Sequence, residues 1–245
     1  LLDRVRAKFS GAAPPASFWI DRTEVSNGDF RRYLEETGSS YRPGLWGPVE
    51  EWDPAWDALP VAGVPYREAQ SYAEWAGKRL PTLAEWDLAA RGPDAAMYPW
   101  GDDETLTPEA LIPWANVFGD DHAWIWSPAD SFPSLAPRYR ERVLPVNVLP
   151  DGYRDVSWIG LVHTLGNVAE WTESVPFIQG AGDFRERIVK GDHWGRDLDE
   201  TWSLRKRMTH FIESGPMLAC GIRCAKTVGL EVPESAGTES PTGRR

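Results

Sequence analysis

Residues 78–92, KRLPTLAEWDLAARG, contain the clearest local folding signals in this chain. Thr82 stands where a helix N-cap is expected and Glu85 follows three residues later, which is the pattern of a capping box. Trp86 begins the apolar side of the expected helix, and Gly92 is a typical C-terminal stop. The stretch therefore predicts a short capped helix with a structural role rather than a catalytic one.

Two further helices are predicted before this stretch. Ser26 is a candidate N-cap with Asp29 at the third helical position, and Gly38 is a candidate stop. The next helix is expected to begin near Pro65 and to end at Gly77. Apolar residues recur at helical spacing in both segments: Phe30, Tyr33, Leu34, Tyr66, Ala69, Tyr72, Ala73 and Ala76. Each helix is therefore expected to bury one face.

Short strands and ordered loops account for the rest of the expected structure. Strand-like segments lie at residues 18–20, 187–190 and 220–226, and residues 160–174 read as a turn that leads into a strand. Helix and strand signals are sparse between residues 93 and 158. The chain has 14 Trp, 21 Pro and 22 Gly, a composition that favours many turns and an interior filled by large rigid side chains. We therefore expect a loop-rich α+β domain.

Charge and hydropathy exclude several classes of function. The formal net charge is −11, so the chain lacks the basic surface of a nucleic-acid-binding protein. No apolar run reaches the roughly 18 residues of a membrane span, and residues 1–15 lack the apolar core of a signal peptide. The two cysteines are too few for a disulfide framework. These features predict a cytoplasmic protein without nucleic-acid partners and without direct membrane insertion.

The order of six segments resembles the formylglycine-generating enzyme (sulfatase-modifying factor) family. The segments are FWIDRTEVSNGDF, PVAGVPYREAQSYAEWAGKRLPTLAEWDLAARG, YPWGDD, GNVAEW, IVKGDHW and GIRCAK. The resemblance implies a C-type-lectin-like α+β fold, loop-rich, with two main helices and small antiparallel sheets. It covers nearly all of an expected domain at residues 18–228, which a lead segment at 1–17 precedes. The disorder-prone composition of the end of the chain predicts a flexible tail at 229–245. The same fold also serves kinase-attached domains, sulfoxide synthases and the variable proteins of diversity-generating retroelements, so fold alone does not set function.

The cysteine pair that the resemblance requires for oxidase activity is missing. Family oxidases bind copper through two thiolates after a turn that corresponds here to the start of residues 191–207, and that stretch contains no cysteine. The two positions fall near Arg196 and Thr201. Cys224 matches a structural cysteine of the family's closing strand, and Cys220 lies four residues before it. Copper is therefore not expected, and the missing cysteine pair argues against an enzyme.

The resemblance also implies calcium held by loop oxygens. The implied ligands are the carbonyls of Gly166, Val168 and Val117 and the side chains of Glu170 and Asn116. His163 stands where the family often has an asparagine ligand, which weakens the first site. The alternative is that Asn116 and Asn167 cap turns and that Glu170 pairs with a basic group.

Residues 191–219 lie where lectin-like folds present their ligand face, and they depart most from the family pattern. They are rich in Trp and Arg, residue types that carry binding energy at interfaces. The candidate ligand-binding residues are Asp192, His193, Arg196, Asp197, Asp199, Trp202, Arg205, Arg207, His210 and Phe211. Trp194 is instead expected to anchor the loop in the core.

Three hypotheses about function follow. The leading one is a non-catalytic domain that binds an unknown protein or small-molecule ligand, with a retroelement-diversified variable protein as its most specific form. The second is an oxygen-dependent formylglycine-generating oxidase that acts on a sulfatase cysteine. The third is a structural partner domain of a sulfoxide synthase, and the sensor domain of a larger bacterial signalling protein is a second form of the leading hypothesis.

Overall fold

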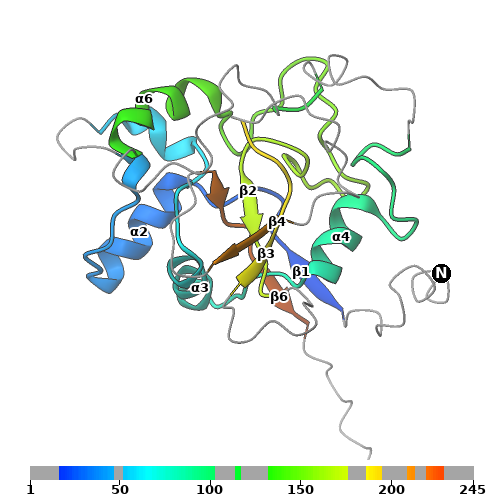
Figure 1. The fold of residues 1–245 in the computed structure, drawn as a ribbon, viewed down its shortest axis with the longest axis horizontal. Helices are drawn as coiled ribbons and strands as arrows, with labels where there is room; N and C mark the ends of the chain where they lie inside the picture. Colours follow the sequence, from blue (N-terminus) through cyan, green and yellow to red (C-terminus); the bar gives the residue numbers. More distant parts are fainter. Residues whose placement is uncertain are drawn as a thin grey trace, which may run out of the picture.

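Two small β-sheets organise the fold (Figure 1). The computed structural model describes residues 17–46, 52–102, 114–116, 132–175, 186–194, 209–212 and 219–228. The first sheet pairs β1 (Phe18–Ile20) with β6 (Ala225–Thr227). The second sheet has the order β4-β3-β2-β5 and consists of β2 (Ala169–Trp171), β3 (Glu186–Lys190), β4 (Thr209–Ile212) and β5 (Cys220–Gly221).

The strand pairing differs from expectation in two respects. β2 pairs with β3, and β3 with β4, in the expected antiparallel manner, but β2 and β5 run parallel. The single strand expected at residues 220–226 is divided into β5 and β6. Between them, the carbonyls of Ile222 and Cys224 accept hydrogen bonds from Val25 and Asp21 at 2.8 and 2.9 Å. The residues after β1 therefore bind the connection between β5 and β6, where the chain passes from the second sheet to the first.

The three helices predicted from local signals are confirmed. In α2 (Asn27–Thr37) the Ser26 hydroxyl accepts from the Asp29 N–H, and Gly38 ends the helix in the left-handed region. α3 (Tyr66–Trp75) begins after Pro65, and its C-cap Ala76 is followed directly by Gly77, which has a left-handed φ of 67°. α4 (Leu83–Arg91) has both reciprocal bonds of the Thr82–Glu85 capping box. Local capping chemistry thus sets the ends of these helices.

A further helix, α6 (Phe132–Arg142), lies where helix signals were judged sparse, so that prediction was wrong. Its sequence, FPSLAPRYRER, contains Pro137 inside the helix. Proline destabilises a helix interior because it lacks the N–H donor for one backbone hydrogen bond. Tertiary packing compensates: Ala136 and Tyr139 are buried, and Arg140 donates to the Trp46 carbonyl at 2.7 Å. Trp46 ends the short 3-10 helix η1 (Gly44–Trp46), and a second one, η3 (Pro54–Ala58), follows it.

Aromatic side chains fill the interior, as the composition predicted. In the view of Figure 1, α2, α3 and α6 lie on one side of the central strands and α4 lies on the other. Phe30 of α2 stacks on Tyr72 of α3 with ring centroids 5.5 Å apart. Trp171 of β2 is fully buried and donates from Nε1 to the Val64 carbonyl at 2.8 Å.

The predicted lead segment and tail fall almost wholly outside the described ranges, and only Ser17 of the lead segment belongs to them. Among the described helices, none combines the length and the apolar character needed to cross a membrane. The fold class is therefore the loop-rich α+β arrangement expected, with an additional long helix and one parallel strand pair.

Candidate metal and binding site

The turn before β2 is held by one asparagine, Asn167. Its φ of 72° lies in the left-handed region, which asparagine tolerates better than most residues. Its Nδ2 donates to Glu24 Oε2 at 2.8 Å and to the Leu144 carbonyl at 3.1 Å. Its Oδ1 accepts from Asn116 Nδ2 at 3.0 Å and from the Leu144 N–H at 2.8 Å. The side-chain amide thus uses both donors and both acceptor positions, and it joins three segments that are distant in sequence.

Glu170 of β2 forms a buried ion pair with Arg223. Arg223 Nη2 donates to Glu170 Oε1 at 2.7 Å and Nε donates to Oε2 at 2.9 Å, while Trp86 Nε1 donates to Oε2 at 2.5 Å. The other Arg223 donors reach three backbone carbonyls, those of Asp21, Arg22 and Val162. Neither Glu170 nor Arg223 has any exposed surface, so each charge depends on the other for compensation.

This pairing bears directly on the calcium site expected at Gly166, Val168 and Glu170. The Arg223 guanidinium neutralises the Glu170 carboxylate. This agrees with the alternative to calcium binding, in which Glu170 pairs with a basic group. A carboxylate engaged in this way is a weaker ligand for a cation, because the cation must compete with Arg223. Glu170 therefore fits the ion pair better than it fits calcium, and calcium binding stays a prediction.

The second predicted calcium position begins at Asn116, which the structure places beside the first. The Asn116 carbonyl accepts from the Asn167 N–H at 2.7 Å, and its Nδ2 also donates to the Arg142 carbonyl at 2.8 Å. Val117 lies outside the described residues. Over the ranges that the structure describes, no three His, Cys, Asp or Glu side chains are grouped to hold a metal. Asn116 thus acts as a bridge between loops, in agreement with the turn-capping alternative.

Glu24, which the sequence reasoning missed, is buried within this network. It accepts from the Val168 N–H at 3.2 Å in addition to its bond with Asn167. Burial raises its pKa well above the usual range for a glutamate, with the Glu170 carboxylate adding to the effect. The segment FWIDRTEVS contains nothing that marks Glu24 as buried, because its partner Asn167 lies 143 residues later in the sequence.

A buried tyrosine–histidine pair lies behind the same turn. The Tyr153 hydroxyl and His163 Nδ1 are 2.8 Å apart. Burial lowers the pKa of His163 to about 4, so the imidazole is neutral at pH 7. Burial also raises the pKa of Asp155 to about 6, although its carboxylate accepts from the three backbone N–H groups of residues 164–166. Because those donors favour the ionised form, we assign Asp155 as a carboxylate that fixes the loop.

The predicted ligand face begins directly after β3. Gly191 has a φ of 76° and turns the chain inward. Asp192 and His193 are only 3% and 5% exposed, so neither predicted contact presents its side chain at the surface. Trp194 is buried with its ring centroid 6.3 Å from that of Tyr139, as expected for a core anchor.

The other predicted contacts are divided between β4 and residues outside the described ranges. His210 and Phe211 belong to β4, where their backbones pair with Ile188 and Arg187 of β3. Six predicted contacts lie outside the described ranges: Arg196, Asp197, Asp199, Trp202, Arg205 and Arg207. The ligand face therefore stays a prediction, but the strands that would frame it are in place.

The two cysteines occupy structural positions. Cys220 and Cys224 are buried free thiols. Burial raises the pKa of Cys220 above its ordinary value and that of Cys224 to about 12. Because the thiolate is the form that attacks a substrate or binds copper, neither cysteine is prepared for such chemistry at neutral pH.

The sequence matches the family described as "Sulfatase-modifying factor enzyme 1-like domain" over residues 12–228. The chain belongs to this family. It is 34% identical over 177 residues to the mouse (Mus musculus) protein "Inactive C-alpha-formylglycine-generating enzyme 2", an alignment that covers 70% of the chain and 50% of that protein. It is also 40% identical over 194 residues to the formylglycine-generating enzyme of Thermomonospora curvata, covering 63% of the chain and 58% of the enzyme.

A third relative adds another activity to this sulfatase-modifying-factor family. The hercynine oxygenase of Mycolicibacterium thermoresistibile is 30% identical over 231 residues, covering 75% of the chain and 45% of that enzyme. The chain thus spans about half the length of these relatives. Relatives with such different descriptions show that family membership alone does not assign a reaction to this chain.

Solved structures share the fold of this family member. PvdO from Pseudomonas aeruginosa matches with a TM-score of 0.60 at 21% identity, covering 86% of this chain and 80% of PvdO. Treponema denticola variable protein 1 matches with a TM-score of 0.57 at 16% identity, covering 86% and 84%. These likenesses establish the formylglycine-generating-enzyme-like, C-type-lectin-like fold and nothing about activity.

Proposed function

We propose that this chain is a non-catalytic domain that binds a protein or a small-molecule ligand. The observation that carries the proposal is the position of its cysteines. None lies within residues 191–219, where the oxidases of the family are expected to have their reactive pair, and the two that the chain has are buried thiols with raised pKa values. The similarity to a relative described as inactive supports the same conclusion.

Oxygen consumption tests the non-catalytic part of the proposal. The chain is incubated with copper(I) and a cysteine-containing sulfatase peptide, with the Thermomonospora curvata enzyme as a positive control. We expect no oxygen uptake above background, and the same result for Cys220→Ser and Cys224→Ser. Copper-dependent oxygen uptake that is coupled to loss of the peptide thiol would instead assign the oxidase function.

The proposed binding face is the segment 191–219. It leaves the sheet at β3 through the turn at Gly191, is anchored by Trp194 and passes through β4 before it reaches β5. Segments that connect the strands of a rigid scaffold often carry variable binding residues, because their sequence can change without loss of the core.

A displayed library tests whether this segment is a variable binding surface. Six positions are randomised together: Arg196, Asp197, Asp199, Trp202, Arg205 and Arg207. We expect many folded variants with melting temperatures close to that of the wild type, and selection against a protein such as lysozyme should yield binders. A library with almost no folded members would contradict the proposal.

The retroelement form of the proposal is tested at the DNA level. Similarity of fold to a Treponema variable protein makes this form worth testing, but at 16% identity it supports the scaffold only. We expect a near-copy of the codons for residues 191–224 beside a reverse transcriptase gene. A genomic neighbourhood without either would exclude diversification and leave a binding domain of fixed specificity.

A further inference from the structure

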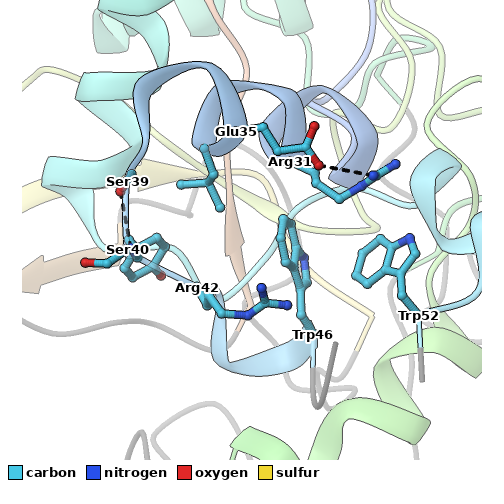
Figure 2. Close-up of a pocket in the computed structure, with 9 residues that line it drawn as sticks. Arg31, Glu35, Ser39, Ser40, Arg42, Trp46 and Trp52 are labelled. Carbon is cyan, nitrogen blue, oxygen red and sulfur yellow. Dashed lines mark hydrogen bonds and ion pairs between the residues drawn. The ribbon is translucent and has the colours of Figure 1, made fainter. Parts of the chain in front are cut away.

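A hollow beside α2 has the size and lining of a small-molecule site (Figure 2). Its volume is about 410 Å³, within the range of known ligand pockets. Leu34 and Glu35 line it from α2. Arg42 lines it from the loop that follows α2 (Figure 2). Trp46 and Trp52 form its aromatic side. The hollow lies on a different part of the chain from the predicted ligand face at 191–219.

The aromatic side of the hollow is rigid before any ligand arrives. Trp46 Nε1 donates to Asn27 Oδ1 at 2.7 Å, and Trp52 Nε1 donates to Asp57 Oδ1 at 3.2 Å. The two rings meet edge to face with centroids 4.9 Å apart. A preformed aromatic corner favours a flat, apolar group, because little conformational entropy is lost on binding.

The charged side chains of the hollow favour a single negative charge. Arg31 is already paired, at 2.7 Å with Asp57 and at 3.3 Å with Glu35. Arg42 is exposed, lies with its guanidinium carbon 5.8 Å from the Trp46 ring centroid, and forms no ion pair with any residue in the described ranges. One available guanidinium next to one carboxylate suits a monoanion better than a dianionic phosphate.

Comparison with two other surface hollows strengthens this assignment. In a chain of net charge −11, the hollow beside α2 has more basic than acidic lining residues. The hollow around Tyr72 and Lys78 has equal numbers of both, and the hollow around Trp100 and Trp158 has an acidic excess. Because Asp57 and Glu35 already compensate Arg31, the charge that distinguishes the α2 hollow is that of Arg42 alone.

We propose that this hollow binds a small aromatic carboxylate, with the carboxylate on Arg42 and the ring against Trp52, which the buried Trp46 supports from behind. The guanidinium supplies two parallel N–H donors to the carboxylate oxygens, and the tryptophan rings exclude water from the apolar part. This site is independent of the proposed function of residues 191–219.

Isothermal titration calorimetry with three indole compounds tests the assignment. The probes are indole-3-acetate, the neutral indole-3-acetamide and the cationic tryptamine, which share one ring system and differ in charge. We expect the acid to bind the wild-type chain about tenfold or more tightly than the amide, because a hydrogen bond to a charged group is stronger than one to a neutral group. Tryptamine is expected to bind most weakly.

Substitution of Arg42 separates this site from any other. Arg42→Gln should weaken binding of the acid about tenfold or more and leave the amide unchanged, so that the two probes become equivalent. Arg42→Lys should restore only part of the preference, because lysine cannot make the paired bonds. Arg67→Gln, an exposed arginine of α3 outside the hollow, is the matched control and should behave as the wild type.

Three results would overturn the proposal. The first is equal affinity of the wild type for acid and amide, and the second is unchanged acid affinity in Arg42→Gln. The third is absence of acid binding up to millimolar concentrations. Trp202→Ala, within the predicted ligand face, should leave acid binding unchanged, so failure of one proposal does not imply failure of the other.

Discussion

Arg223 and Arg42 are both arginines with well-defined contacts, yet they occupy opposite kinds of environment. Arg223 is fully buried, and its donors are used by Glu170 and by backbone carbonyls. Arg42 is exposed and contacts the Trp46 ring, without an ion pair among the described residues. The comparison teaches that the charge of Arg223 serves the fold, because buried groups already compensate it, whereas the charge of Arg42 is available to a ligand.

The largest effect is expected from Arg223→Gln. Its removal leaves the buried Glu170 carboxylate uncompensated beside Glu24, so we expect a loss of about 3–5 kcal/mol in the free energy of unfolding. Urea denaturation measures it. Arg42→Gln is the matched control and should change stability by less than about 0.5 kcal/mol.

The double variant Arg223→Gln/Glu170→Gln sharpens the same comparison. Because both charges are removed together, its loss should be smaller than the sum of the two single losses. A loss below about 1 kcal/mol for Arg223→Gln alone would show that the buried pair does not hold the fold.

A second large effect concerns pH, through the buried His163. Its pKa is about 4 in the folded chain and about 6.5 when unfolded, so the unfolded chain takes up a proton first as the pH falls. Stability is therefore lost between about pH 6.5 and pH 4, by on the order of 3 kcal/mol. The raised pKa of Asp155 acts in the opposite direction, adding stability as the pH falls through about 6.

His163→Asn isolates the histidine contribution from that of Asp155. Asparagine tolerates the φ of 59° at this position and does not titrate. We expect the stability of the wild type to fall more steeply between pH 6.5 and pH 4 than that of His163→Asn, by urea unfolding at each pH. Parallel curves would contradict the buried, neutral state of His163.

An intermediate effect is expected where two glycines with similar backbones differ in surroundings. A Cβ at Gly191 (φ 76°) would lie 3.2 Å from the Thr164 carbonyl, whereas one at Gly38 (φ 65°) meets nothing within 4 Å. Both alanine variants should lose about 1 kcal/mol from the left-handed conformation alone. Gly191→Ala should lose about 1 kcal/mol more through its tight contact. Equal losses of stability in the two variants would mean that the loop at Thr164 moves away from the new Cβ without an energetic cost.

The smallest effect is expected for calcium. A saturated site would stabilise the chain by about 2.7 kcal/mol at a hundredfold excess over its dissociation constant. Because Arg223 already compensates Glu170, we expect a smaller difference than this in melting curves recorded with calcium and with chelator. A full shift that disappears in Glu170→Gln would restore Glu170 as a calcium ligand.

The elements that the sequence predicted correctly are those fixed by local chemistry. Ser26, Thr82 and Gly38 form their capping hydrogen bonds with residues at most four positions away. Such helix ends can therefore be predicted from a single sequence. α6 was missed because Pro137 disrupts the local signal and packing of Tyr139 against distant residues restores the helix. β4 was missed because it is defined by its pairing with β3, whose partner residues lie at least 20 positions away in the sequence.

The candidate site was predicted less completely, for the same reason. Glu170 was identified, but its partner Arg223 lies 53 residues later and its identity depends on the fold. Asn167 and Glu24 meet across 143 residues. Local sequence shows which groups are present, whereas only the folded chain shows which of them compensate one another.

The pairing of β1 with β6 has a consequence for how such a domain is connected to other domains. Phe18 lies opposite Thr227, so the first and last strands of the described chain lie side by side although nearly the whole described chain separates them. A unit closed in this way can be inserted into a surface loop of a host protein with little distortion. The same closure joins the most distant partners in the sequence, and we therefore expect it to be among the last contacts to form during folding.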